Sequence, residues 1–203
     1  MNPLEADLAA YYDQEAGERA ERQLLPQRVA HRAAFLDLLV AEGRSRVVEI
    51  GTGPGVDAQA FLDRGLAVSG VDLSAVHVRR AREVGVDAVV GSVLDLPYPD
   101  GSFDAGWTMS TLLHVPDSHL DAALSEVVRV LEPGAPLAVG VWGGLDREGP
   151  GDQDSFQPPR FFSLRSHERW RAALERHARV EEWDTWAPEG QPWTYQWAVL
   201  RRG

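Results

Sequence analysis

The sequence predicts an α/β fold with one doubly wound, mostly parallel β-sheet, and two observations carry this prediction. Short apolar runs rich in Val alternate with amphipathic helical stretches along most of the 203 residues. Hydrophobic residues make up 44% of the chain, which is ordinary for a globular domain. Strands separated by helices are joined by right-handed crossovers, so helices should cover both faces of the sheet.

The N-terminal part, residues 1–43, is expected to form a helical cap. Apolar positions recur at helical spacing from Leu4 to about Val40, and Gly43 follows as a stop signal. Strand and helix patterns then alternate through residues 44–143, the core of the domain. The expected strands are 46–51, 66–72, 86–92, 103–110 and 136–143, and the expected helices are 56–65, 75–85 and 120–134.

Residues 144–162 interrupt this alternation. They are rich in Gly, Pro and Asp and show almost no periodicity, so we expect a loop or lid. Residues 163–203 then predict a helix at 166–178 and two alternating strands at 179–186 and 193–202, which form an antiparallel hairpin. All four parts are expected to belong to a single domain over residues 1–203.

Charge and composition exclude several classes of function. The chain has 31 Asp and Glu against 20 Arg and no Lys, and its net charge of −11 would repel a nucleic acid. Schiff-base chemistry needs Lys, and thiol chemistry needs Cys, which is also absent. The first residues are too charged for a signal peptide, and no apolar run reaches the roughly 18 residues of a membrane span. We therefore expect a cytoplasmic protein without nucleic-acid or membrane partners.

Residues 47–55, VVEIGTGPG, form a glycine-rich turn between a buried strand and a helix. Glycines at 51, 53 and 55 let a ligand lie against the backbone, and the helix N-terminus offers N–H groups to an anion. The G-x-G-x-x-G pattern of dinucleotide redox cofactors would need Gly or Ala at position 56, which is Val56. A purely structural turn is the alternative for this loop taken alone.

Carboxylates follow the next two strands. Asp72 ends the second strand beside the glycine loop, where it could accept hydrogen bonds from both hydroxyls of a ribose, while Ser74 can cap the following helix. Asp95 follows the third strand and could accept from an adenine amino group. The fourth strand, 103–110, ends where the strand order reverses, which is where such sheets bind ligands.

Together these stretches resemble the consecutive motifs of the class I S-adenosylmethionine-dependent methyltransferases, with methyltransferase domains of types 11 and 25. The matching stretches are VVEIGTGPG, VDLS, GSVLDLP, FDAGWTMSTLLHV and VVRVLEPGAPLAVGVWG, over roughly residues 46–143. The resemblance implies a Rossmann-like sheet of seven strands in the order 3-2-1-4-5-7-6, with strand seven antiparallel. It also implies S-adenosylmethionine as cofactor, S-adenosylhomocysteine as product, and a small-molecule methyl acceptor.

The resemblance assigns roles to single residues. Glu49 matches the acidic residue that helps place the methionine part of the donor, Asp72 matches the ribose-binding acid, and Asp95 matches the acceptor for the adenine amine. Leu73, Val93 and Leu94 match apolar neighbours of the adenine ring. Gly51, Thr52, Gly53 and Gly55 match the loop beneath the methionine part of the donor. Met109 and Ser110 fall where the end of the fourth strand passes the donor.

The acceptor stays open between oxygen, nitrogen and carbon nucleophiles. Methylases that act on amide or base nitrogen carry an NPPY-like signature after the fourth strand, where this chain has STLLHV. The absence of that signature disfavours those two acceptors. His114 follows the fourth strand and is the candidate general base for a hydroxyl acceptor, with packing or loop capping before Pro116 as the alternative. The other five histidines are expected on the surface, and no metal site is expected, since His114 and His119 do not have the spacing of a ligand pair.

Aromatic residues gather in two places. Tyr11 and Tyr12 lie in the helical cap, where they either close over the donor or simply pack. Nine of the 17 aromatic residues lie within 156–197. Four residues flank the loop and could wall an acceptor pocket: Trp142, Phe156, Phe161 and Phe162. A homodimer interface would use the same residues, and both interpretations stay open.

Two other functions are also consistent with a glycine loop at a strand end. A nicotinamide-dependent oxidoreductase is disfavoured by Val56 and by the lack of an evident Tyr or Lys pair for hydride transfer. A binding module that keeps the S-adenosylmethionine pocket but transfers nothing is the second alternative.

Overall fold

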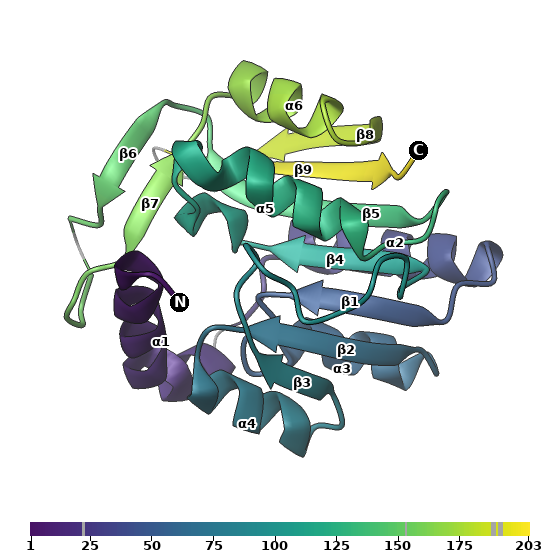
Figure 1. Cartoon of the computed structure of the whole chain (residues 1–203), viewed down its shortest axis with the longest axis horizontal. Coiled ribbons are helices and arrows are strands. Elements are labelled where there is room, and N and C mark those ends of the chain that lie inside the picture. Colours follow the sequence, from purple (N-terminus) through teal and green to yellow (C-terminus); the bar gives the residue numbers. More distant parts are fainter. Residues whose placement is uncertain (22, 153, 188–189, 191–192) are drawn as a thin grey trace.

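Seven strands form one sheet in the order β3-β2-β1-β4-β5-β9-β8 (Figure 1). The computed structural model describes residues 1–203 apart from 22, 153, 188–189 and 191–192. Five strands are parallel, and their bounds are Arg46–Ile50 (β1), Ala67–Asp72 (β2), Asp87–Val90 (β3), Ala105–Met109 (β4) and Pro136–Gly143 (β5). Strand β9 (Thr194–Arg201) runs antiparallel to β5 and pairs with β8 (Arg179–Trp186). The predicted fold class and strand order are therefore confirmed.

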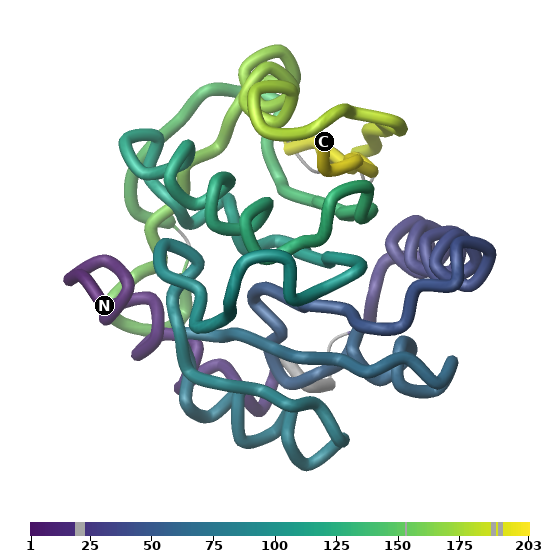
Figure 2. The backbone as a smooth tube through the Cα atoms, turned by 45° about the vertical axis from the view of Figure 1, so that its right-hand side comes forward, coloured from purple at the N-terminus to yellow at the C-terminus, as the bar shows by residue number. Residues whose placement is uncertain are grey.

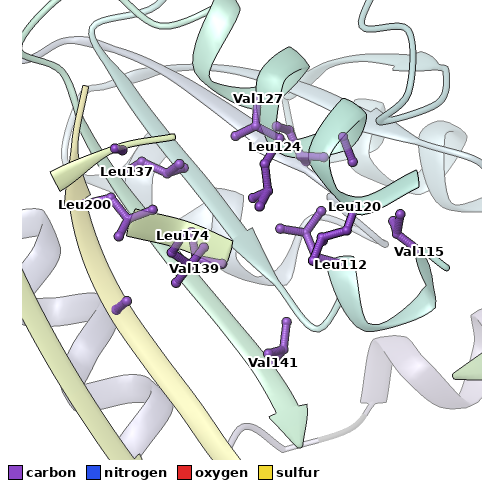
Figure 3. Close-up of a cluster of buried hydrophobic side chains, with 14 of the residues drawn as sticks. Leu112, Val115, Leu120, Leu124, Val127, Leu137, Val139, Val141, Leu174 and Leu200 are labelled. Atoms are coloured by element: carbon purple, nitrogen blue, oxygen red, sulfur yellow. The ribbon is translucent and has the colours of Figure 1, made fainter. Parts of the chain in front are cut away.

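Helices cover both faces of this sheet. Helices α5 (Asp117–Arg129) and α6 (His167–Glu175) cover one face, where Leu124 and Val127 pack near Leu137 and Leu174 (Figure 3). On the opposite face lie α2 (Pro26–Ala41), α3 (Val56–Asp63) and α4 (Ala75–Glu83). Burial on both faces explains why the central strands read as continuous apolar runs instead of alternating ones.

Aromatic rings fill the core under α2 and α3. Trp107 of β4 lies completely buried, with ring centroids 5.5 Å from Phe35, 5.3 Å from Phe61 and 5.4 Å from Trp197. Edge-to-face and tilted contacts of this kind add to the free energy that burial of the rings contributes. These contacts pack β4 against α2, α3 and β9.

The helical cap is two helices that lie on different sides of the molecule (Figure 2). Helix α1 (Pro3–Glu21) lies across the carboxyl ends of the strands, whereas α2 packs behind the sheet (Figure 1). Pro26 opens the second helix, because proline fits the first turn, where no N–H is needed. The helical pattern from Leu4 to Val40 thus contains a break that periodicity alone does not reveal.

The segment expected to be a loop, 144–162, contains regular structure. Strand β6 (Arg147–Pro150) pairs antiparallel with β7 (Phe161–Leu164) in a separate two-stranded sheet. The sequence REGP has low strand propensity, so it gives no signal of a strand. Its pairing with β7 keeps it extended. The expectation of a segment without secondary structure is wrong at these residues, while a lid function stays a prediction.

One buried carboxylate joins three elements of the core. Asp57, in the first turn of α3, is 2% exposed and accepts hydrogen bonds from Arg28 and Arg32 of α2. It also accepts the indole N–H of Trp107 at 3.1 Å. Burial works against the charge of Arg28, but Asp57 raises the pKa of its guanidinium, so the ion pair persists inside the protein.

We expect Asp57→Ala to lower the free energy of unfolding by about 3–5 kcal/mol, because two partly buried guanidinium groups and a buried indole N–H lose their partner. Urea unfolding followed by circular dichroism measures the change. Asp37→Ala is the matched control, since Asp37 pairs with Arg64 at the surface with 71% of its side chain exposed and should change stability by about 0.5 kcal/mol or less. Equal losses in both variants would contradict this assignment.

Candidate active site

Three neighbouring cavities open at the carboxyl edge of the sheet and share lining residues. The β2 cavity lies over the ends of β1 and β2 and under α1, the glycine-loop cavity lies beside residues 51–57, and the aromatic cavity lies between α1, β5 and β9. The predicted site residues that line the β2 cavity are Gly51, Gly53, Asp72, Leu73, Val93, Leu94, Met109, Ser110 and His114. Those that line the glycine-loop cavity are Glu49, Gly51, Thr52, Gly53 and Met109.

The glycine loop brings backbone close to both of the first two cavities. Gly51 and Gly53 adopt φ angles of 73° and 55°, in the left-handed region that favours glycine. A Cβ atom on Gly51 would lie 1.9 Å from Oγ1 of Thr111, so no other residue fits. Gly55 lines none of the three cavities, and a Cβ atom there would meet Val84 at 2.8 Å, which gives this glycine a packing role between α3 and α4.

Asp72 is held firmly at the end of β2. Its Oδ2 accepts the Gly53 N–H at 2.8 Å and its Oδ1 accepts the Ser74 N–H at 2.8 Å. Ser74 caps α4 by accepting the backbone N–H of His77 at 3.0 Å, as expected. Each carboxylate oxygen can accept a second hydrogen bond, so Asp72 is positioned by the backbone and still able to bind a diol.

Glu49 is buried below the glycine loop, with 3% of its surface exposed. Burial raises its pKa well above the usual value, and the charge of Asp57 raises it further, while the 2.7 Å hydrogen bond from Thr52 Oγ1 and the charge of Arg28 act against the rise. A cation in the glycine-loop cavity would offset the unfavourable charge of this carboxylate.

Asp95 lies outside the cavities. It is exposed, lines none of the three, and donates its backbone N–H to the Ser92 carbonyl at 3.2 Å. The acidic side chain that lines the β2 cavity next to Ser92 is Glu5 of α1, a residue outside all the predicted site residues. No local sequence signal near Glu5 indicates that it lines this cavity, because its partner Ser92 is 87 residues away in the chain.

His114 is tied to α1 and to β7. Its Nδ1 lies 2.7 Å from the carbonyl oxygen of Phe161, and its Nε2 lies 2.7 Å from the hydroxyl of Tyr12. A carbonyl can only accept, so Nδ1 carries the hydrogen and Nε2 accepts from Tyr12. Tyr12 and His114 both line the β2 cavity and the aromatic cavity, so the pair stands in the wall that the two share.

The aromatic cavity has a volume of about 200 Å³. Its aromatic lining residues are Tyr12, Trp142, Phe162, Trp186 and Tyr195. Ser110, which lines this cavity and the β2 cavity, has φ 55° although it is not a glycine, and its hydroxyl lies 3.2 Å from that of Tyr195. Phe156 packs edge-on against Tyr11 instead of lining the cavity. Homodimer formation through these residues stays a prediction.

His77 lies inside the protein, and the expectation that it is on the surface is wrong. It is 1% exposed on the inner face of α4, beneath α1, and neither ring nitrogen has a hydrogen-bond partner among the described residues. Its Nδ1 lies 3.5 Å from Oδ1 of Asp72. Helical spacing alone could not show this, because the face of α4 that carries His77 is covered only when α1 docks.

Within the described residues, no group of three or more His, Asp or Glu side chains could hold a metal ion. In the same part of the chain, no helix is both long and apolar enough to cross a membrane.

Residues 47–134 match the family model of a methyltransferase domain. A 2-methyl-6-phytyl-1,4-hydroquinone methyltransferase of Synechocystis is 34% identical over 106 residues, covering 49% of this chain and 33% of the relative. A 27-O-demethylrifamycin SV methyltransferase of Amycolatopsis mediterranei is 33% identical over 113 residues, covering 51% of this chain and 40% of the relative. The chain thus spans only about a third to two fifths of these relatives.

The fold matches that of a Burkholderia thailandensis 1,6-didemethyltoxoflavin-N1-methyltransferase, solved with 1,6-didemethyltoxoflavin and S-adenosylhomocysteine bound. The TM-score is 0.70 at 20% identity, with 100% of this chain and 91% of that chain covered. The chain therefore has the fold of the class I S-adenosylmethionine-dependent methyltransferases, as the sequence motifs predict. Residues 47–134 resemble a methyltransferase domain, and the solved structure with S-adenosylhomocysteine supports the predicted cofactor, S-adenosylmethionine.

We expect Glu49→Gln to change how stability depends on pH. The folded protein holds a proton on Glu49 more tightly than the unfolded chain does, so the free energy of unfolding falls as pH rises through and above the usual carboxyl range. The amide removes this fall, and near about pH 8 the variant should be more stable by on the order of 1.4 kcal/mol for each unit by which the pKa is raised.

Urea unfolding at about pH 4 and about pH 8 measures the effect. Glu83→Gln is the control, because Glu83 is exposed at the end of α4. A parallel pH dependence in the parent and in Glu49→Gln would show that Glu49 ionises normally.

Proposed function

We propose that this protein transfers a methyl group from S-adenosylmethionine to a hydroxyl oxygen of a small aromatic molecule. The observation that carries the proposal is the hydrogen bond of 2.7 Å between Tyr12 and His114 in the wall shared by the β2 cavity and the aromatic cavity. Oxygen acceptors need a group that takes a proton, and this pair offers one beside the place where donor and acceptor would meet.

In this proposal, S-adenosylmethionine would lie across the β2 and glycine-loop cavities. Asp72 would accept hydrogen bonds from the ribose hydroxyls, and Leu73, Val93 and Leu94 would pack against the base. Glu49, in the glycine-loop cavity, would compensate the positive charge of the methionine part, which explains why a carboxylate persists in a buried position.

The aromatic cavity is the proposed acceptor site. Its volume suits one ring system, since a cavity of about 150 Å³ already binds benzene. The two cations in its wall are paired with buried carboxylates, Arg28 with Asp57 and Arg160 with Asp154. It therefore presents aromatic surface more than net charge, which favours an uncharged aromatic acceptor.

The names of the relatives support a small-molecule acceptor. One relative acts on a hydroquinone and the other on an O-demethylated rifamycin, both of which are oxygen-bearing small molecules. The choice of oxygen rests on the Tyr12–His114 pair and not on the names, because other relatives are C-methyltransferases of sterols.

The proton would leave through Tyr12. S-Adenosylmethionine supplies a methyl group already activated on sulfonium, so the chain mainly has to orient the acceptor and exclude water. As the acceptor oxygen bonds to the methyl carbon and the carbon–sulfur bond breaks, the oxygen of Tyr12 accepts the acceptor proton and its own proton passes to Nε2 of His114. Burial disfavours the charge of Arg160, but its hydrogen bond to Asp154 and the nearness of Tyr12 raise its pKa, so a permanent cation stands beside this relay.

Asp72→Ala should abolish measurable binding of S-adenosylhomocysteine, because the two charge-assisted hydrogen bonds to the ribose contribute roughly 1.5–3 kcal/mol each. Isothermal titration calorimetry on the parent, expected to bind in the micromolar range, and on the variant measures this. Asp63→Ala, at an exposed site on α3, is the control and should bind as the parent does. Failure of the parent to bind would refute the donor assignment.

Tyr12→Phe should lower kcat for phenols by about 10²-fold or more while leaving the affinity for S-adenosylhomocysteine unchanged, because it removes the relay but keeps the ring. The assay uses labelled donor and a series of substituted phenols and hydroquinones. The loss should be largest for phenols of high hydroxyl pKa and nearly absent for phenols already ionised at the assay pH, a pattern that lost packing would not produce.

Tyr11→Phe is the matched control, since Tyr11 neighbours Tyr12 in the helix but lines none of the three cavities. An equal loss for ionised and neutral phenols would contradict the relay. Products methylated on carbon or nitrogen would overturn the oxygen assignment, and donor binding without transfer to any phenol would favour the binding-module alternative.

A further inference from the structure

The β2 cavity is lined by two carboxylates among the described residues, Asp72 and Glu5. Asp72 ends β2, where the ribose is expected. Glu5 belongs to α1 and lies against the segment that follows β3, the strand paired with β2 through Asp72 and Val90. The two acids thus lie on different walls of one cavity. This arrangement suits an adenosine, whose ribose hydroxyls and adenine amino group lie at opposite ends.

Hydrogen bonds hold the Glu5 carboxylate in a defined place. Its Oε2 accepts the backbone N–H of Asn2 at 2.8 Å, and its own N–H donates to Oδ1 of Asn2 at 3.0 Å. This reciprocal pair is a capping box at the start of α1, with Pro3 at the first helical position. The hydroxyl of Ser92 donates to Oε1, while the N-terminal ammonium of Met1 lies 4.0 Å from Oε2, so Oε1 keeps a further acceptor position.

Ser92 connects this carboxylate to the apolar wall where the base is expected. The backbone N–H of Leu94 donates to Oγ of Ser92 at 3.0 Å, which orients the hydroxyl hydrogen toward Glu5. Val93 and Leu94 line the same cavity. The Glu5 side chain is only 14% exposed, so a hydrogen bond made there is shielded from water.

We propose that Glu5 accepts a hydrogen bond from the exocyclic amino group of the donor adenine, the role that the motif resemblance assigns to Asp95. Asp95 is exposed and lines none of the three cavities, whereas Glu5 is partly buried in the wall of the β2 cavity. A carboxylate accepts but does not donate, so this site selects an amino group and rejects a 6-oxo group, which would place two acceptors face to face.

This proposal rests on the donor binding in the β2 cavity and adds a specificity residue to it. It also gives α1 a direct part in donor recognition, because Glu5 and Tyr12 lie on the same helix. The helix would then contact the adenine end with Glu5 and the methyl-transfer end with Tyr12.

The test compares two ligands, S-adenosylhomocysteine and its hypoxanthine analogue S-inosylhomocysteine, by isothermal titration calorimetry on the full chain. The parent should prefer the adenine ligand by roughly 10- to 100-fold, the range of a hydrogen bond to a charged group. In Glu5→Gln the preference should fall to about 3-fold or less, because an amide offers both a donor and an acceptor. Gln also serves in a capping box, so the helix should remain intact, which the melting temperature of the ligand-free variant checks.

Asp95→Asn is the matched control and should keep the full preference of the parent. Asp72→Ala should weaken both ligands alike, since both carry the ribose. A preference retained in Glu5→Gln, or lost in Asp95→Asn, would overturn the role of Glu5 while leaving the donor assignment intact. Failure of the parent to bind either ligand would overturn both.

Discussion

The interaction on which the rest of the site depends is the buried ion pair of Asp57 with Arg28 and Arg32. Asp57 follows the glycine loop directly, its partners lie on α2, and it also receives the indole N–H of Trp107 in β4. A charge this deeply buried is stable only when its partners are in place, so the position of α2 and that of the loop are coupled. Arg28 lines both the glycine-loop cavity and the aromatic cavity, which places the proposed donor and acceptor sites on either side of one side chain.

Helix α1 completes the site in a different way, through polar contacts at its inner face. Glu5 meets Ser92, Asp13 accepts the hydroxyl of Ser74 and the N–H of Val76, and Tyr12 meets His114. Apolar contacts add to these, since Tyr11 and Ala16 of the same helix are buried. Enclosure of this kind also excludes water from a transfer reaction that needs precise alignment.

The buried acids show where function works against stability. Glu49 pairs with the Thr52 hydroxyl but is surrounded by the carboxylates of Asp57 and Asp72, and its pKa is raised accordingly. Ser110 keeps a left-handed backbone at the end of β4 although it is not a glycine. Backbone strain at Ser110 and unfavourable charge at Glu49 thus gather at one edge of the sheet. Such a concentration is typical of a ligand site, where a bound ligand offsets what the free protein leaves unfavourable.

The sequence by itself determined the α/β class, the strand order through its motif resemblance, and the grouping of Asp72 with Gly51 and Gly53. These features follow from local periodicity and from turn chemistry, both of which act over a few residues. Tertiary structure alone decided that Glu5 and not Asp95 lines the β2 cavity, that His77 is buried, that Tyr12 meets His114, and that residues 147–150 form a strand. Each of these depends on how α1 or β7 docks against residues distant in the chain, and no local pattern records such contacts.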